Sequence, residues 1–123
     1  SVSVNQVEFS LTQNKAMYNG TLDQMMAKNI QPMAWSPLGS IYKESSEQTT
    51  RIKKQLSILS TKYNVTEDQL LLAWVLKHPS KIIPAIGSTD ITRIKNALNA
   101  TTIQLELEDW FLLLQASQGH EVP

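Results

Sequence analysis

Three short segments carry polar, aromatic and small residues close to the points where predicted β-strands end. Asn5 and Gln6 lie in the first strand-like segment, Trp35 and Ser36 end the second, and residues 87–89 (GST) follow the third. In parallel α/β structures, ligands bind at the carboxyl ends of the strands. An amide, an indole beside hydroxyls, and a turn with free backbone N–H groups at a helix start would suit a flat polar ring and a phosphate.

Other familiar site chemistries are missing from the sequence. His78 and His120 are far apart, and neither has a metal-like partner at helical spacing, so surface histidines are favoured over metal ligands. No GxSxG segment offers a hydrolase nucleophile, and no carboxylate pair stands at strand ends. Neither GxGxxG nor GxxxxGKS/T is present, which argues against a Rossmann or P-loop phosphate site. We therefore predict no metal site.

Size and composition limit the class of protein further. A chain of 123 residues, 41% of them hydrophobic, can bury the core of one domain and is too short for two. Lysine plus arginine and aspartate plus glutamate number 11 each, so the net charge is zero. This balance argues against a nucleic-acid partner and against a polybasic membrane anchor. The absence of cysteine excludes disulfides and allows a reducing compartment.

The ends and the apolar runs of the chain predict no membrane segment. The longest apolar run, residues 70–76, is far shorter than a bilayer span, and no signal-peptide pattern stands at the start. The sequence opens without methionine, almost directly in a strand pattern. This opening favours a chain that has been cut at its N-terminal end.

Strand and helix patterns alternate along the chain. Residues 2–9 and 30–35 read as strands, and residues 82–86 read as a short, fully buried one. Between the first two strands we expect a helix that starts at Thr21. After a polar loop at 42–50 we expect one helix and then a second that starts at Thr66. After the third strand we expect a helix with Ile91, Ile94 and Leu98 on one face, and a last helix from 107 to 116 before Gly119. Such alternation predicts an α/β fold with parallel strands and right-handed crossovers.

Four motifs in this order resemble the aldo/keto reductase family. They are residues 4–8 (VNQVE), 34–39 (AWSPLG, usually AYSPLG), 66–79 (TEDQLLLAWVLKHP) and 83–94 (IPAIGSTDITRI). Each motif alone is weak, but four in register cover nearly all of residues 1–123. The resemblance implies a partial TIM (β/α)8 barrel made of its last three β/α units, barrel strands six to eight with their helices. It also implies an NADPH-dependent oxidoreductase that reduces an aldehyde or ketone to an alcohol in the cytoplasm.

The resemblance assigns cofactor-binding residues to this chain. It implies that Gln6 hydrogen-bonds the nicotinamide carboxamide and that Trp35 stacks on the ring, as a tyrosine does in many members. The matched residues that would contact the pyrophosphate are Ser36, Leu38, Gly39 and Ser40. Those at the 2′-phosphate would be Gly87, Ser88, Thr89 and Arg93, and Asn96 would reach the adenine edge. The plainer alternatives are an inward-facing polar residue for Gln6, core packing for Trp35 and a solvated helix charge for Arg93.

Two departures from the family pattern bear on the cofactor. Gly87 stands where many members have lysine, and Asn96-Ala97 stands where many have glutamate-asparagine. Both changes weaken the preference for NADP over NAD, so NAD is not excluded.

The family's catalytic residues have no counterpart in the sequence. The family uses an aspartate, a tyrosine acid, a lysine and a histidine on earlier strands, and Tyr18, Tyr42 and Tyr63 lie in other contexts. We therefore predict that the chain contains no catalytic residue and does not reduce carbonyls alone. We also expect two open strand edges that favour self-association or pairing with the missing barrel half.

Three hypotheses remain from the sequence. The chain is part of a full reductase, or it is a non-catalytic nucleotide-binding or assembly module, or it is a plain α/β domain with no nicotinamide affinity. The first is favoured.

Overall fold

One parallel sheet and the helices around it make up the described part of the chain. The computed structural model describes residues 3–85 and 91–120. The sheet contains β1 (Ser3–Glu8), β2 (Ile30–Trp35) and β3 (Ile83–Pro84), in the order β1-β2-β3. The helices are η1 (Lys15–Met17), α1 (Thr21–Ala27), α2 (Glu47–Tyr63), α3 (Glu67–Leu76), α4 (Ile91–Ala100) and α5 (Leu107–Gln118). The α/β class and the parallel strands are confirmed.

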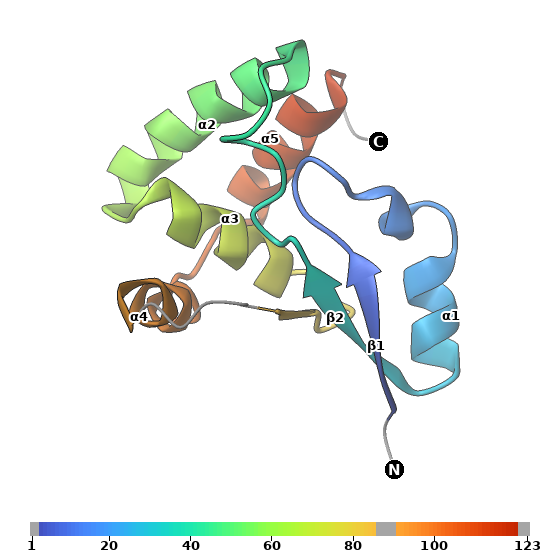
Figure 1. Cartoon of the computed structure of the whole chain (residues 1–123). Helices are drawn as coiled ribbons and strands as arrows, with labels where there is room; N and C mark the ends of the chain where they lie inside the picture. The colour runs from blue at the N-terminus through green and yellow to red at the C-terminus, as the bar shows by residue number, and fades with distance from the viewer. Residues whose placement is uncertain (1–2, 86–90, 121–123) are drawn as a thin grey trace.

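Figure 1 shows α2, α3 and α5 grouped together, α1 on the far side of the two long strands, and α4 near α3. The two long strands run side by side, so that Gln6 pairs with Met33 and Glu8 with Trp35, and β3 extends the sheet through Met33 and Ile83. All three strands point the same way. Their carboxyl ends therefore share one edge of the sheet, as the sequence predicts.

Local capping explains where the helices begin, and it corrects two expectations. Thr66 caps α3 through a capping box with Gln69, as predicted. Thr21 is not the cap of α1; Gly20 holds that position with a φ of 84°, and the side chain of Asn19 accepts the Thr21 N–H instead. The predicted loop at 42–50 ends early, because Ser46 and Thr49 form a capping box that starts α2 at Glu47.

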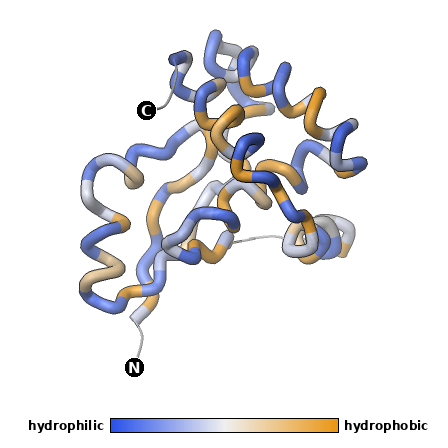
Figure 2. The backbone as a smooth tube through the Cα atoms, turned by 180° about the vertical axis from the view of Figure 1, so that it is seen from behind, coloured by the Kyte–Doolittle hydropathy of each residue, from blue (hydrophilic) through white to orange (hydrophobic). Residues whose placement is uncertain are grey.

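The long helix α2 is amphipathic. Ile52, Leu56 and Leu59 are buried at helical spacing, and Figure 2 shows hydrophobic and hydrophilic residues alternating along this helix. Asn64 ends α2 in the left-handed conformation with a φ of 55°. The apolar face of α2 therefore packs on the core.

A stack of aromatic rings forms the centre of the core. Trp74 is fully buried between Phe9, at 5.5 Å between ring centroids, and Trp110, at 4.9 Å and nearly parallel. Each indole N–H also donates to the main-chain carbonyl of the other tryptophan, at 3.1 and 2.8 Å. These contacts hold α3, α5 and the end of β1 together.

The expectation of a fully buried last strand is wrong, and the helix after it packs through its small residues. β3 contains two residues, and Ile83 is exposed, because no described segment covers that face of the sheet; Ile86 lies outside the described residues. In α4, Ile91 and Leu98 are exposed, whereas Ala97 and Ala100 are buried against Leu72 of α3. Close helix packing favours the small side chains at this contact; the Ile94 side chain lies outside the described set.

A buried carboxylate joins the end of α2 to the start of α5. Asp109 is 4% exposed and accepts hydrogen bonds from the Lys62 ammonium at 2.7 Å and the Tyr63 hydroxyl at 2.5 Å. Burial alone would raise the pKa of Asp109, but the hydrogen bonds from Lys62 and Tyr63 outweigh it and lower that pKa. The ionised carboxylate is therefore the form that stabilises this contact.

We expect the unfolding midpoint in urea to fall as the pH drops below about 4, the usual pKa of an unfolded aspartate. A carboxyl whose folded pKa is depressed contributes stability above its unfolded pKa, and this contribution is lost as the pH falls through the folded value. Asp109→Asn should lower the midpoint at pH 7 and flatten its decline in acid. The exposed neighbour Glu108→Gln is the control, and equal acid profiles for both variants would contradict the assignment.

Candidate functional site

One face of the sheet is left open and carries the predicted ring-binding residues. Paired residues of parallel strands point to the same side, so Gln6 and Glu8 share a face with Met33 and Trp35. On the opposite face, Val7 and Ala34 pack in the core. The open face is solvent-accessible: Val4 is 53%, Trp35 44% and Ile83 46% exposed.

Gln6 and Trp35 are brought together on this face. Trp35 is paired with Glu8, two residues beyond Gln6 on β1, so the amide and the indole are diagonal neighbours at the carboxyl edge of the sheet. Both side chains are exposed. Trp35 is 44% exposed, so part of its side chain is accessible to a flat ligand.

The loop after Trp35 makes a tight turn. Ser36 and Gly39 have positive φ angles of 51° and 67°, and the Gly39 N–H donates to the Ser36 carbonyl at 2.9 Å. Leu38 packs its side chain against the core, so it can offer a ligand mainly its backbone. Ser40 follows the turn, so the hydroxyls of Ser36 and Ser40 stand within five residues of the indole in the sequence.

Two hydroxyls that the sequence reasoning missed support this turn. The Ser40 N–H donates to the Thr12 hydroxyl at 3.0 Å, and the hydroxyls of Thr12 and Ser10 are hydrogen-bonded at 3.2 Å. A Cβ on Gly39 would lie 2.1 Å from the Thr12 hydroxyl oxygen and 2.7 Å from that of Ser10. The available signal was the polar run that follows β1, because it must share an edge with residues 36–40.

Gly39→Ala should therefore disrupt the turn and lower the affinity for any ligand that binds there. The substitution adds a side chain to a residue with positive φ and also forces a clash with Thr12, which shares the site's edge. Gly20→Ala is a matched control, since Gly20 has a φ of 84° but nothing within 4 Å of the added Cβ. Thermal unfolding should show a larger loss for Gly39→Ala, and equal losses would mean that only backbone strain matters.

The third predicted part of the site, residues 87–96, is described only in part. Gly87, Ser88 and Thr89 lie outside the described residues, as do the side chains of Arg93 and Asn96. The backbone places positions 93 and 96 in α4, which packs against α3. Their assignment to the 2′-phosphate and adenine stays a prediction.

The three tyrosines take part in structural hydrogen bonds. The Tyr18 hydroxyl accepts from Gln118, that of Tyr42 donates to Glu67, and that of Tyr63 donates to Asp109. Burial, together with the neighbouring carboxylates, raises the pKa of Tyr42 and of Tyr63. A tyrosine that acts as a general acid near neutral pH needs the opposite shift.

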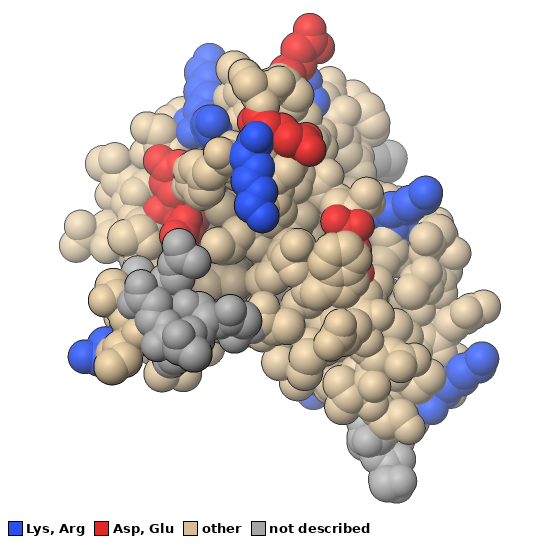
Figure 3. Space-filling model, in the orientation of Figure 1, with Lys and Arg blue, Asp and Glu red and all other residues tan. Residues whose placement is uncertain are grey.

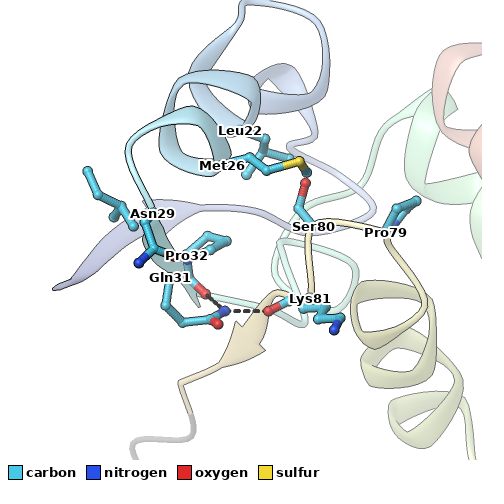
Figure 4. Close-up of a pocket in the computed structure, with 9 residues that line it drawn as sticks. Leu22, Met26, Asn29, Gln31, Pro32, Pro79, Ser80 and Lys81 are labelled. Atoms are coloured by element: carbon cyan, nitrogen blue, oxygen red, sulfur yellow. Dashed lines mark hydrogen bonds between the residues drawn. The ribbon is translucent and has the colours of Figure 1, made fainter. Parts of the chain in front are cut away.

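A separate pocket lies at the other end of the strands. It has a volume of about 320 Å³ and is lined by the first residues of β2, by α1 and by the segment before β3, where the Gln31 amide donates to the carbonyls of Pro32 and Lys81 (Figure 4). Trp35 and the turn at 36–40 are at the carboxyl edge. This pocket is thus distinct from the predicted site.

Charge and metal chemistry add no second site on the described residues. Basic and acidic side chains are interspersed on the face shown in Figure 3. Within residues 3–85 and 91–120, no group of three histidine, aspartate or glutamate side chains is placed to hold a metal ion. None of the helices in that part is long and apolar enough to cross a bilayer.

The open sheet face carries an amide and an indole at the carboxyl ends of two parallel strands. Residues 1–117 match the aldo/keto reductase family, and the chain belongs to that family. The predicted resemblance is confirmed at this level.

Two curated relatives are oxidoreductases by name. The oxidoreductase YdhF of Escherichia coli is 33% identical over 124 residues, covering 100% of this chain and 42% of its own length. The 6-dehydroglucose reductase of Agrobacterium fabrum is 33% identical, covering 96% of this chain and 39% of its own length. This chain therefore spans about two-fifths of the length of these relatives.

Solved aldo-keto reductases share the fold. The thermostable enzyme Tm1743, solved with the inhibitor epalrestat, superposes with a TM-score of 0.73 at 25% identity, over 92% of this chain and 39% of that one. An aldo/keto reductase from Klebsiella pneumoniae, solved with NADP and acetate, gives a TM-score of 0.73 at 23% identity, over 98% and 40%.

Proposed function

We propose that these residues form part of the cofactor-binding wall of an NADPH-dependent aldo/keto reductase that reduces an aldehyde or ketone to an alcohol. The supporting observation is the pairing of Gln6 and Trp35 on one exposed sheet face, at the carboxyl edge. The three strands would be the sixth, seventh and eighth of the barrel. The open face would then line the barrel interior.

The chain's residues fit such a cofactor. The Gln6 amide can donate to and accept from the nicotinamide carboxamide, and the Trp35 indole can stack on its ring. In the turn at 36–40, Gly39 lies so close to Thr12 and Ser10 that a side chain would clash with them, and the hydroxyls of Ser36 and Ser40 are the groups we propose for the pyrophosphate. When bound, the cofactor supplies hydride; this chain's residues bind and orient it.

Proton transfer is the part of the reaction that this chain lacks on our account. Tyr42 and Tyr63 are hydrogen-bonded to carboxylates and have raised pKa values, so neither suits a proton donor at neutral pH. We therefore expect no catalytic residue among the described side chains and no turnover by the chain alone.

An absorbance assay tests the absence of turnover. The chain is mixed with NADPH and a reactive aromatic aldehyde, and the loss of reduced nicotinamide is followed. The expected rate equals that of the mixture without protein. A rate that rises in proportion to the chain's concentration, and survives repurification, would overturn the proposal that these residues lack a proton donor.

The choice between NADP and NAD rests on Arg93. A guanidinium can grip the 2′-phosphate in a bidentate way, but Gly87 and Asn96 replace residues that favour NADP in many family members. We propose NADPH as the preferred cofactor, by a modest margin. Titrations with NADPH and NADH on the same preparation compare the two affinities, and equal values would remove the proposed role of Arg93.

A second candidate function is a non-catalytic nucleotide-binding or assembly module. It is favoured by the exposed apolar residues Val4, Trp35 and Ile83 on the open face and by β1 and β3 as the edges of the described sheet. Either candidate predicts self-association or pairing with the rest of a barrel. Sedimentation velocity should show species larger than 13.8 kDa at high concentration.

A further inference from the structure

We infer that Thr12 is a positioning residue for the cofactor loop at 36–40, an inference that rests on the proposed function. Thr12 lies in the segment after β1, 28 residues before Ser40, and its hydroxyl accepts the Ser40 N–H at 3.0 Å. This is a cross-link between the loops that follow two neighbouring strands. It sits at the edge of the sheet that carries Trp35.

The environment of the Thr12 hydroxyl explains why it can fix the loop. Ser10 is fully buried, and its hydroxyl is hydrogen-bonded to that of Thr12 at 3.2 Å; it also accepts the Gln13 N–H at 3.1 Å. Gly39 approaches both hydroxyls so closely that no side chain fits there. The turn is thus seated on two hydroxyls whose own positions are held.

The segment that carries Thr12 is itself anchored to the helices. The Thr12 carbonyl accepts from the Gln48 amide at 3.5 Å, and the same amide donates to the Ser117 carbonyl at 3.1 Å. The Ser117 hydroxyl, which is buried, donates to the Leu11 carbonyl at 2.5 Å. The loop at 36–40 is therefore tied through Thr12 to the start of α2 and the end of α5.

This arrangement also changes what the loop can offer a phosphate. The N–H groups of Gly39 and Ser40 are both used inside the protein, by the Ser36 carbonyl and by Thr12. Ser40 can then contribute its hydroxyl, while its main chain serves to hold the turn. Thr12 acts on the cofactor through Ser40 and Gly39, not by touching it.

The test is NADPH binding by calorimetry with three forms of the chain: unmodified, Thr12→Val and Thr12→Ser. Thr12→Val keeps the shape and removes the hydroxyl, and a lost hydrogen bond of this kind corresponds to roughly a three- to tenfold weaker affinity. Thr12→Ser keeps the hydroxyl and should bind within about twofold of the unmodified chain. Amide exchange at Ser40 should accelerate in Thr12→Val alone.

The outcomes separate this inference from the proposed function. If the unmodified chain binds and Thr12→Val binds equally well, the positioning role is wrong and the proposed function stands. If the folded, unmodified chain does not bind, both fail. Should Thr12→Val not fold, Thr12→Ser and Thr12→Ala decide: equal affinity of these two would overturn the inference, and a weaker Thr12→Ala with an unchanged Thr12→Ser would support it.

Discussion

Trp35→Ala is expected to weaken NADPH binding by roughly 5- to 150-fold while leaving the chain folded. Loss of stacking between a planar ring and an aromatic side chain costs about 1–3 kcal/mol. Trp35 is 44% exposed, and no segment within residues 3–85 and 91–120 covers its face of the sheet, so its removal leaves no cavity in the core. Calorimetry is the suitable measurement, because it does not depend on the fluorescence of the residue that is removed.

Two control variants sharpen this experiment. Trp35→Phe keeps an aromatic face and should recover most of the affinity. Tyr18→Ala removes another exposed aromatic residue, far from Trp35 in the sequence, and should bind as the unmodified chain does. If Trp35→Ala binds as tightly as Tyr18→Ala, Trp35 does not stack on the nicotinamide.

Trp74→Ala is expected to act on folding instead of binding, and to lower the free energy of unfolding by about 3–5 kcal/mol. Trp74 is fully buried, stacks with Phe9 and Trp110, and donates its indole N–H to the Trp110 carbonyl at 3.1 Å. The free energy of unfolding of a domain of this size is about 5–15 kcal/mol, so the variant should be mostly unfolded at moderate urea concentrations. Urea unfolding followed by circular dichroism measures the loss.

The two tryptophan variants control each other. Trp74→Phe keeps a ring in the stack and loses the hydrogen bond, so its loss should be clearly smaller than that of Trp74→Ala. Trp35→Ala should shift the urea midpoint very little. A stability loss at Trp35 as large as that at Trp74 would show that the sheet face is covered in solution.

Much of the site follows from local patterns plus one rule of topology. The strand patterns at 2–9 and 30–35 and the helices after them imply parallel strands, and parallel strands bring Gln6 and Trp35 to the same edge. These features depend on residues close in sequence, which is why the sequence alone predicts them.

The features that sequence reasoning missed depend on contacts between distant segments. Hydrogen bonds from Ser40 to Thr12, and from Gln48 to Ser117, join loops and helix ends and leave no periodic signal. The face of α4 that packs against α3 consists of Ala97 and Ala100, and the larger Ile91 and Leu98 stay exposed. A hydrophobic pattern cannot distinguish a helix face that packs closely from one left uncovered.

Titration of the unmodified chain with NADPH shows whether these residues bind a nicotinamide cofactor. The chain is first shown to be folded by circular dichroism, and binding is then measured by calorimetry at constant pH and salt. We expect saturable binding of one NADPH per chain, and we expect Trp35→Ala to weaken it. A folded chain that gives no saturable binding would contradict the claim that these residues form a cofactor-binding wall.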